Sequence, residues 1–110
     1  MLPTTMLYKA VLIIDTAIEH RVLKAIRQMG ATGYTCLACF GEGPRTIQNE
    51  PFMGSTQIQV EVVASRKIVE DLVALVESST FGSSSRTAYI ETVEVMNPEK
   101  FLGQVSVAAT

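Results

Sequence analysis

The stretch YTCLACFGEGPRTIQNEPFMGSTQIQVEVV, residues 34–63, decides the fold of this chain. Two short apolar runs, residues 34–40 and 57–63, flank a segment of sixteen residues, 41–56, that holds three glycines, two prolines and one arginine. Hairpin loops usually hold about two to five residues, and much longer structureless loops in compact domains are mostly functional. The two runs therefore predict a β-hairpin, and we expect the loop between them to be mobile and to contact a ligand or partner.

Composition limits the remaining possibilities. The 110 residues support one domain, 47% of them are hydrophobic, and the net charge of −2 argues against a general nucleic-acid binder. No apolar run approaches the ~20 residues of a membrane span. The opening MLPTTMLYK lacks the basic region of a signal peptide. We therefore expect a cytoplasmic protein that is not embedded in a membrane.

Cysteine and histidine give no metal or redox signal. Cys36 and Cys39 form a C-x-x-C, but residues i and i+3 of a strand point to opposite faces. We interpret them as two ordinary buried thiols. His20 is the only histidine, which makes a poor metal site.

The order of elements follows from hydrophobic periodicity. Residues 6–14 are almost continuously apolar, which is typical of a central strand. Residues 17–29 have helical spacing, with Thr16 and Glu19 as a capping box and Gly30 at the C-terminal end.

The second half of the chain repeats this order. Ser65 caps a second helix, and residues 78–85 break the pattern before a strand over 87–96. Pro98 ends regular structure, so we divide the chain into a domain of residues 1–97 and a C-terminal tail of residues 98–110.

The resulting β-α-β-β-α-β order predicts an α+β, ferredoxin-like sandwich with one sheet face packed on two helices. Apolar residues on the strands exceed what one face can hold. We expect some of them on the second face, which implies self-association; the residues concerned are Met6, Tyr8, Cys36, Ala38 and Ile90.

The segment GATGYTCLACFGEGPR, residues 30–45, resembles the junction that leads into the T-loop of PII signalling proteins. Gly30, Gly33 and Thr35 match the G-x-x-G-x-T turn of that family, and the glycine-rich loop start continues to an arginine. Residues 57–76 resemble its third strand and second helix, so the resemblance covers roughly residues 7–96.

Two departures favour one branch of the family. Residues 80–86 lack the lysine of the phosphate loop, and residues 41–56 lack the tyrosine of nitrogen-regulatory members. The chain looks more like the carboxysome-associated PII proteins (CPII) and their SbtB relatives. This resemblance implies a homotrimer that binds an adenine nucleotide, ADP or AMP, between subunits, with bicarbonate as a second ligand in some members.

The resemblance and the residue types together give the candidate nucleotide contacts. Glycines and arginine at the loop start suit an anion, threonine hydroxyls suit a base edge, and cations at the start of a helix suit a phosphate. Each residue also fits a plain structural role. The candidates are Thr32, Gly33, Tyr34, Thr35, Gly41, Gly43, Arg45, Ser65, Arg66, Phe81, Arg86 and Tyr89.

The expected function is a sensor of inorganic-carbon metabolism, without enzymatic activity or a metal, in which ligands order the loop. By resemblance, the loop engages a bicarbonate transporter or a carboxysome component. Three rivals stay open. They are a nitrogen-regulatory PII paralogue that binds ATP and 2-oxoglutarate, a small ferredoxin-like enzyme, and a trimeric metal-tolerance protein of the CutA type.

Overall fold

The computed structural model describes residues 2–39, 41, 57–82 and 86–102. Their order is β1 (Thr5–Asp15), α1 (Glu19–Gln28), β2 (Thr35–Cys39), β3 (Gln57–Ala64), α3 (Arg66–Glu77), β4 (Arg86–Val95) and a short helix, α4 (Glu99–Leu102). Two single 3-10 turns, Thr16–Ile18 and Ser79–Phe81, precede α1 and follow α3.

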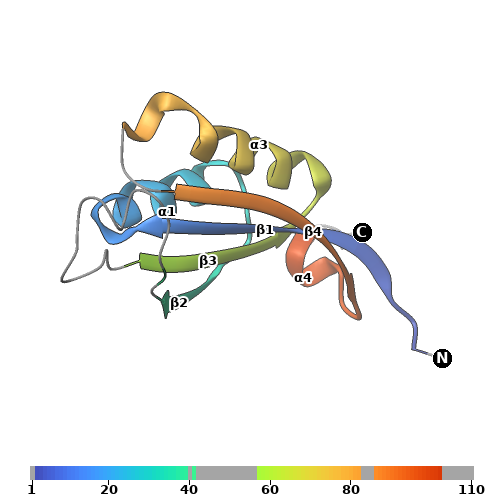
Figure 1. Ribbon diagram of the computed structural model, residues 1–110. Helices are drawn as coiled ribbons and strands as arrows, with labels where there is room; N and C mark the ends of the chain where they lie inside the picture. Colours follow the sequence, from blue (N-terminus) through green and yellow to red (C-terminus); the bar gives the residue numbers. More distant parts are fainter. Residues whose placement is uncertain (1, 40, 42–56, 83–85, 103–110) are drawn as a thin grey trace.

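The four strands form one antiparallel sheet in the order β2-β3-β1-β4 (Figure 1). Helices α1 and α3 lie against each other and against one sheet face. The predicted ferredoxin-like α+β sandwich is therefore confirmed. Strand β1 is central because it pairs with both β3 and β4, which explains its long apolar run.

The core lies between the helices and the sheet. Leu12 on β1 faces Val60 on β3 in the register, and both side chains are fully buried. Helix α1 contributes Val22 and Ile26 to this cluster, and α3 contributes a stripe that includes Leu72. This burial explains why both helices have an apolar face at a period of 3.6 residues.

The helix termini differ in part from expectation. The predicted capping box of Thr16 and Glu19 is wrong, because Asp15 caps instead: its Oδ1 accepts from the N–H of Ala17 at 2.9 Å. A short aspartate side chain reaches the N–H two residues ahead, and the chain enters α1 through a 3-10 turn. Gly30 has a φ of +91°, as expected of a residue that ends a helix.

Helix α3 begins as predicted. The Ser65 Oγ accepts from the N–H of Ile68 at 3.4 Å.

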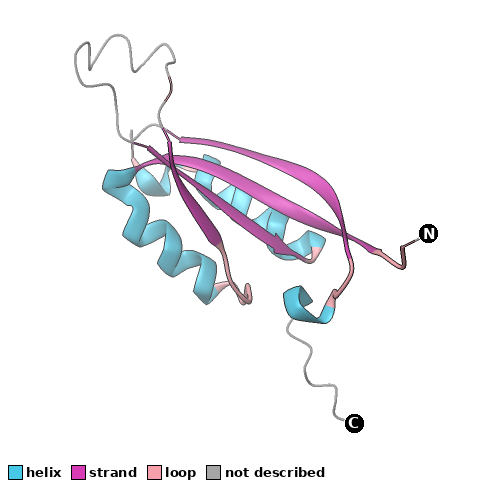
Figure 2. Ribbon diagram, turned by 90° about the horizontal axis from the view of Figure 1, so that it is seen from below, coloured by secondary structure: helices cyan, strands magenta, loops and turns pink. Residues whose placement is uncertain are grey.

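Regular structure does not end at Pro98. The Pro98 carbonyl accepts from the N–H groups of Phe101 and Leu102, at 2.9 and 3.0 Å, and α4 results. Proline is well suited to open a helix, because its fixed φ is helical and its missing N–H would have no partner there. Figure 2 shows α4 as a separate turn, set apart from both long helices. The domain boundary at residue 97 stays a prediction, and residues 103–110 lie outside the described part.

The second sheet face carries apolar side chains among polar and charged ones, but the residues predicted for it are wrong. By register, Met6, Tyr8, Cys36, Ala38 and Ile90 all share the side of Leu12 and Val60, which faces the helices. The opposite side, called here the open face, carries a different set, because side chains alternate along a strand. Its apolar members include Leu7, Val11, Ile13, Leu37 and Tyr89.

The cysteines follow the same alternation. Cys36 pairs with Val60 on the helix side and Cys39 with Gln57 on the open face, so the two thiols lie on opposite faces, as predicted. Their predicted burial is wrong, since Cys36 is exposed and Cys39 half-buried within the chain. Strand β2 is at the edge of the sheet, where fewer neighbours cover a side chain.

Candidate functional site

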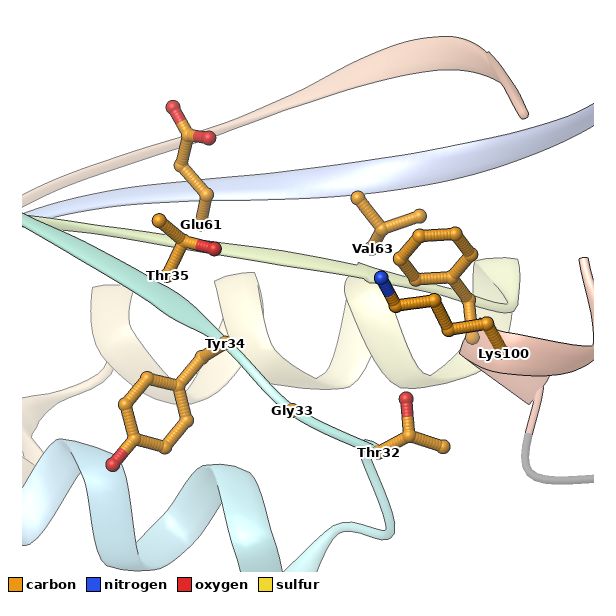
Figure 3. Close-up of a pocket in the computed structure, with 8 residues that line it drawn as sticks. Thr32, Gly33, Tyr34, Thr35, Glu61, Val63 and Lys100 are labelled. Carbon is orange, nitrogen blue, oxygen red and sulfur yellow. The ribbon is translucent and has the colours of Figure 1, made fainter. Parts of the chain in front are cut away.

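A pocket of about 330 Å³ opens between the start of β2, the strand β3 and the helix α4 (Figure 3). It exists because Thr35 faces Glu61 in the register and Val63 lies on the same side, two residues further along β3. Helix α4 lies beside β3 and adds the third wall. The lining residues are Thr32, Gly33, Tyr34, Thr35, Glu61, Val63, Lys100 and Phe101.

The pocket combines three kinds of surface. Thr32 and Thr35 supply hydroxyl groups, which donate and accept hydrogen bonds. The Lys100 ammonium supplies a positive charge and lies 5.5 Å from the centroid of the Phe101 ring. The Phe101 ring and Val63 supply apolar surface. The lining therefore places hydroxyl and ammonium groups beside apolar surface, which allows both polar and apolar contacts to a small molecule.

The negative charge at the pocket is already partly engaged. The Glu61 carboxylate accepts from the Gln59 Nε2 at 2.8 Å and lies 3.8 Å from the Lys9 Nζ. The same ammonium lies 3.2 Å from the Glu91 carboxylate on β4. Lys9 is therefore shared by two carboxylates, and Lys100 is the lining cation that can attract an anionic group.

Tyr34 belongs to the pocket lining, but its side chain points away from the pocket. Figure 3 shows the ring turned away from Thr35 and Lys100. The Tyr34 Oη accepts from the Arg27 Nη2 at 3.3 Å, and the Arg27 guanidinium carbon lies 5.9 Å from the ring centroid.

The structure brings the predicted residues 32–35 together in this pocket and places the remaining described candidates elsewhere. Ser65 caps α3, and the Arg66 Nε donates to the Glu70 carboxylate at 2.7 Å, with its guanidinium over the Tyr8 ring at 4.9 Å. Phe81 is buried, and the Arg21 guanidinium lies 5.1 Å from its ring centroid.

Arg86 and the exposed candidates also lie outside the pocket. The Arg86 guanidinium donates to the carbonyl oxygens of Val76, Ser78 and Gly82. Tyr89 is exposed on the open face, and Gly41 is exposed. Gly43 and Arg45 lie outside the described residues. For all of these, contact with a nucleotide stays a prediction.

Four pocket residues were not among the candidates: Glu61, Val63, Lys100 and Phe101. The alternation of residues 57–63 puts Glu61 on the polar side of its strand, which is a signal that could have found it. Lys100 and Phe101 follow Pro98, and reading that proline as the start of a helix would have given them a fixed position.

Metal-binding clusters and membrane helices are both absent from the residues that the structure describes. No group of three or more histidine, cysteine, aspartate or glutamate side chains among them is arranged to hold a metal ion. No helix in this part of the chain is long and apolar enough to cross a membrane.

Solved structures share this fold. A candidate PII-like signalling protein from Thermus thermophilus is 24% identical, with a TM-score of 0.74 over 92% of this chain and 100% of its own. CPII from Thiomonas intermedia K12, bound to ADP and bicarbonate, is 20% identical, with a TM-score of 0.76 over 92% of this chain and 99% of its own. The same CPII bound to ADP, AMP and acetate is 19% identical, with the same TM-score and coverage.

Sequence comparison gives the family. A comparison with curated proteins gave no match. The sequence profile described as "Nitrogen regulatory protein P-II" matches residues 7–100, which confirms the resemblance seen in residues 30–45. The chain therefore belongs to the P-II family.

Proposed function

We propose that this protein is a homotrimeric regulator that binds an adenine nucleotide, ADP or AMP, in the pocket beside Thr35 and Lys100. The observation that carries the proposal is the pocket itself. The segment Thr32–Thr35, which resembles the ligand-bordering turn of PII proteins, meets the cation Lys100 and the aromatic ring of Phe101 there. CPII, which has the same fold, binds ADP and AMP, and this supports the choice of ligand.

The chemistry of the pocket suits such a ligand. A flat aromatic or aliphatic surface packs against a base, and threonine hydroxyls pair with polar atoms of the base or ribose. An ammonium group attracts phosphate. A volume of about 330 Å³ is at the small end for a ligand of this size, so we expect a second subunit to complete the site.

The open face supports self-association. Tyr89, 43% exposed, pairs with the buried Val11, and Leu37, 48% exposed, lies on the edge strand β2. Exposed large apolar side chains on a sheet face that no helix covers are typical of an interaction surface. A closed ring of three copies would cover it and bring each pocket beside a neighbour.

The regulatory role rests on the loop and on family membership. Residues 41–56 would act as the signalling T-loop, with Gly41, Gly43 and Arg45 beside the ligand, and Arg66, Arg86 or Tyr89 of a neighbouring subunit are further candidate contacts. Bicarbonate is the proposed second ligand, supported by the CPII complex with ADP and bicarbonate. The protein is proposed to be cytoplasmic and to engage a bicarbonate transporter or a carboxysome component, and it signals rather than catalyses a reaction.

A thermal-shift screen with AMP, ADP, ATP and cyclic AMP, each with and without bicarbonate, tests the proposal. A ligand at 100 times its Kd stabilises the folded state by about 2.7 kcal/mol. Thr35→Val removes one pocket hydroxyl at nearly constant volume and should reduce the shift. Thr92→Val is the matched control, since Thr92 is an exposed strand residue of β4 outside the pocket.

The outcomes separate the alternatives. Absence of a shift with every nucleotide contradicts the proposal. ATP binding that depends on 2-oxoglutarate indicates a nitrogen-regulatory paralogue instead. Turnover of phosphate esters indicates an enzyme, and stoichiometric metal binding indicates a CutA-type role.

A further inference from the structure

The pocket wall formed by Thr32, Gly33 and Tyr34 has few anchors. On its N-terminal side the last backbone bond runs from the Ala31 N–H to the Ile26 carbonyl, at 3.4 Å. On its other side the β2 ladder begins at Thr35. Between these two points, in the part of the chain that the structure describes, no further backbone hydrogen bond holds the three residues.

Gly33 adds conformational freedom to the backbone of this wall. A Cβ atom at this position would have no heavy atom within 4 Å, so nothing packs against it. Glycine also loses more conformational entropy than other residues when it becomes ordered. A segment with so few contacts needs a further interaction to hold one conformation.

One side chain supplies that interaction. The Tyr34 ring turns from the pocket toward α1, where the Arg27 Nη2 donates to its Oη at 3.3 Å and the guanidinium carbon lies 5.9 Å from its centroid (Figure 3). Arg27 is in the last turn of α1, a helix fixed to the core by Val22 and Ile26. The contact therefore joins the wall to a rigid element.

We propose that Tyr34 and Arg27 are a positioning pair that holds this wall, and Thr35 next to it, in the conformation that receives the ligand. Successive side chains of an extended segment point to opposite sides. Fixing the Tyr34 ring against α1 therefore fixes the Thr35 hydroxyl toward the pocket. The ligand class, an adenine nucleotide, rests on the proposed function; the geometry of the wall does not.

The first test needs no ligand. Backbone ¹⁵N order parameters of Gly33, Tyr34 and Thr35 would be compared in the wild type, Arg27→Gln, Tyr34→Phe and Lys24→Gln. Lys24 is an exposed cation one turn before Arg27 and lines no part of the pocket, so its variant is the matched control.

Arg27→Gln should lower the order parameters of the wall from about 0.85 toward 0.6, the range of a flexible backbone. Tyr34→Phe keeps the ring over the guanidinium but loses the hydrogen bond, and should give intermediate values. Lys24→Gln should match the wild type. Order parameters in Arg27→Gln equal to those of the wild type would overturn the proposal.

The second test measures ADP affinity by calorimetry, with thermal unfolding of the same samples. Arg27→Gln should weaken ADP binding by about three- to tenfold, the equivalent of one hydrogen bond, while its Tm stays close to that of Lys24→Gln. Unchanged ADP affinity in a variant with a loosened wall also overturns the positioning role. If the wild type binds no ADP, the proposed function fails, and the order parameters alone decide whether the pair positions the wall.

Discussion

The Arg86 Nη2 donates to the Ser78 carbonyl oxygen at 2.7 Å. Its guanidinium also donates to the carbonyls of Val76 and Gly82. The last carbonyls of a helix have no partner within it, so Arg86 supplies donors to the C-terminal end of α3 and to the turn that follows. The residue that the sequence suggests as a phosphate contact therefore has a structural role within one chain.

Arg86→Ala should lower the free energy of unfolding by about 1.5–3 kcal/mol, the contribution of hydrogen bonds to a charged group. Urea unfolding measures this loss. Arg86→Lys should restore only part of the stability, because an ammonium cannot reach three carbonyls in the geometry of the guanidinium. A large loss of nucleotide affinity at unchanged stability would instead show that Arg86 contacts the ligand.

Cys36 gives a prediction on pH. Although Cys36 is exposed, partial desolvation of its thiol, followed by the negative charge of Glu19, raises the pKa of this thiol. Because the thiolate is the nucleophile, alkylation of Cys36 by iodoacetamide should rise with pH later than at an ordinary cysteine. Mass spectrometry of the labelled protein between about pH 7 and 10 gives this midpoint.

Glu19→Gln removes the second of these two causes and should shift the Cys36 midpoint to lower pH. The same pKa shift also makes the stability of the folded chain depend on pH. The folded chain binds the proton more tightly, so stability is unaffected below the unfolded thiol pKa and falls as pH rises above it. A midpoint that Glu19→Gln leaves unchanged would exclude the contribution of that carboxylate.

The sequence predicts the fold well because its signals are local. The alternation of residues 57–63, the apolar run of β1 and the Ser65 cap each depend on near neighbours, and each is confirmed. The errors at the start of α1 and after Pro98 concern element ends. There, Asp15 competes with Thr16 for the same cap, and a proline can either end a helix or open one.

The site is less predictable because it depends on segments far apart in the chain. The glycine and threonine pattern of residues 30–35 identifies one wall of the pocket. Lys100 and Phe101 come to that wall only through the packing of α4 beside β3, which no local pattern encodes. The sequence predicts a second apolar face but not its residues, because the register, in which Leu12 pairs with Val60, decides which alternate side chains face the helices.

Assembly is tested on the open face. Light scattering should give the mass of a trimer at micromolar concentration. Leu37→Glu puts a charge on this face and should dissociate the assembly, because a buried charge without a partner is costly. Ala74→Glu is the control, since Ala74 is exposed on α3 and adds the same charge elsewhere. A wild-type monomer would contradict both the trimer and the shared site.

Lys100 is the residue that most directly tests the pocket. Lys100→Gln removes the ammonium near Phe101 but keeps a polar side chain of similar length, so the fold should be unaffected. A charge-assisted bond to phosphate is worth about 1.5–3 kcal/mol, so calorimetry should show ADP binding weakened by about ten- to a hundredfold. Lys67→Gln is the matched control, because Lys67 lines no part of the pocket and its Nζ lies 3.1 Å from the Asp71 carboxylate on α3.

Salt screens such attractions, so the affinity of the wild type should also fall more steeply with ionic strength than that of Lys100→Gln. If Lys100→Gln and Lys67→Gln bind ADP with equal affinity and equal salt dependence, the nucleotide binds away from this pocket.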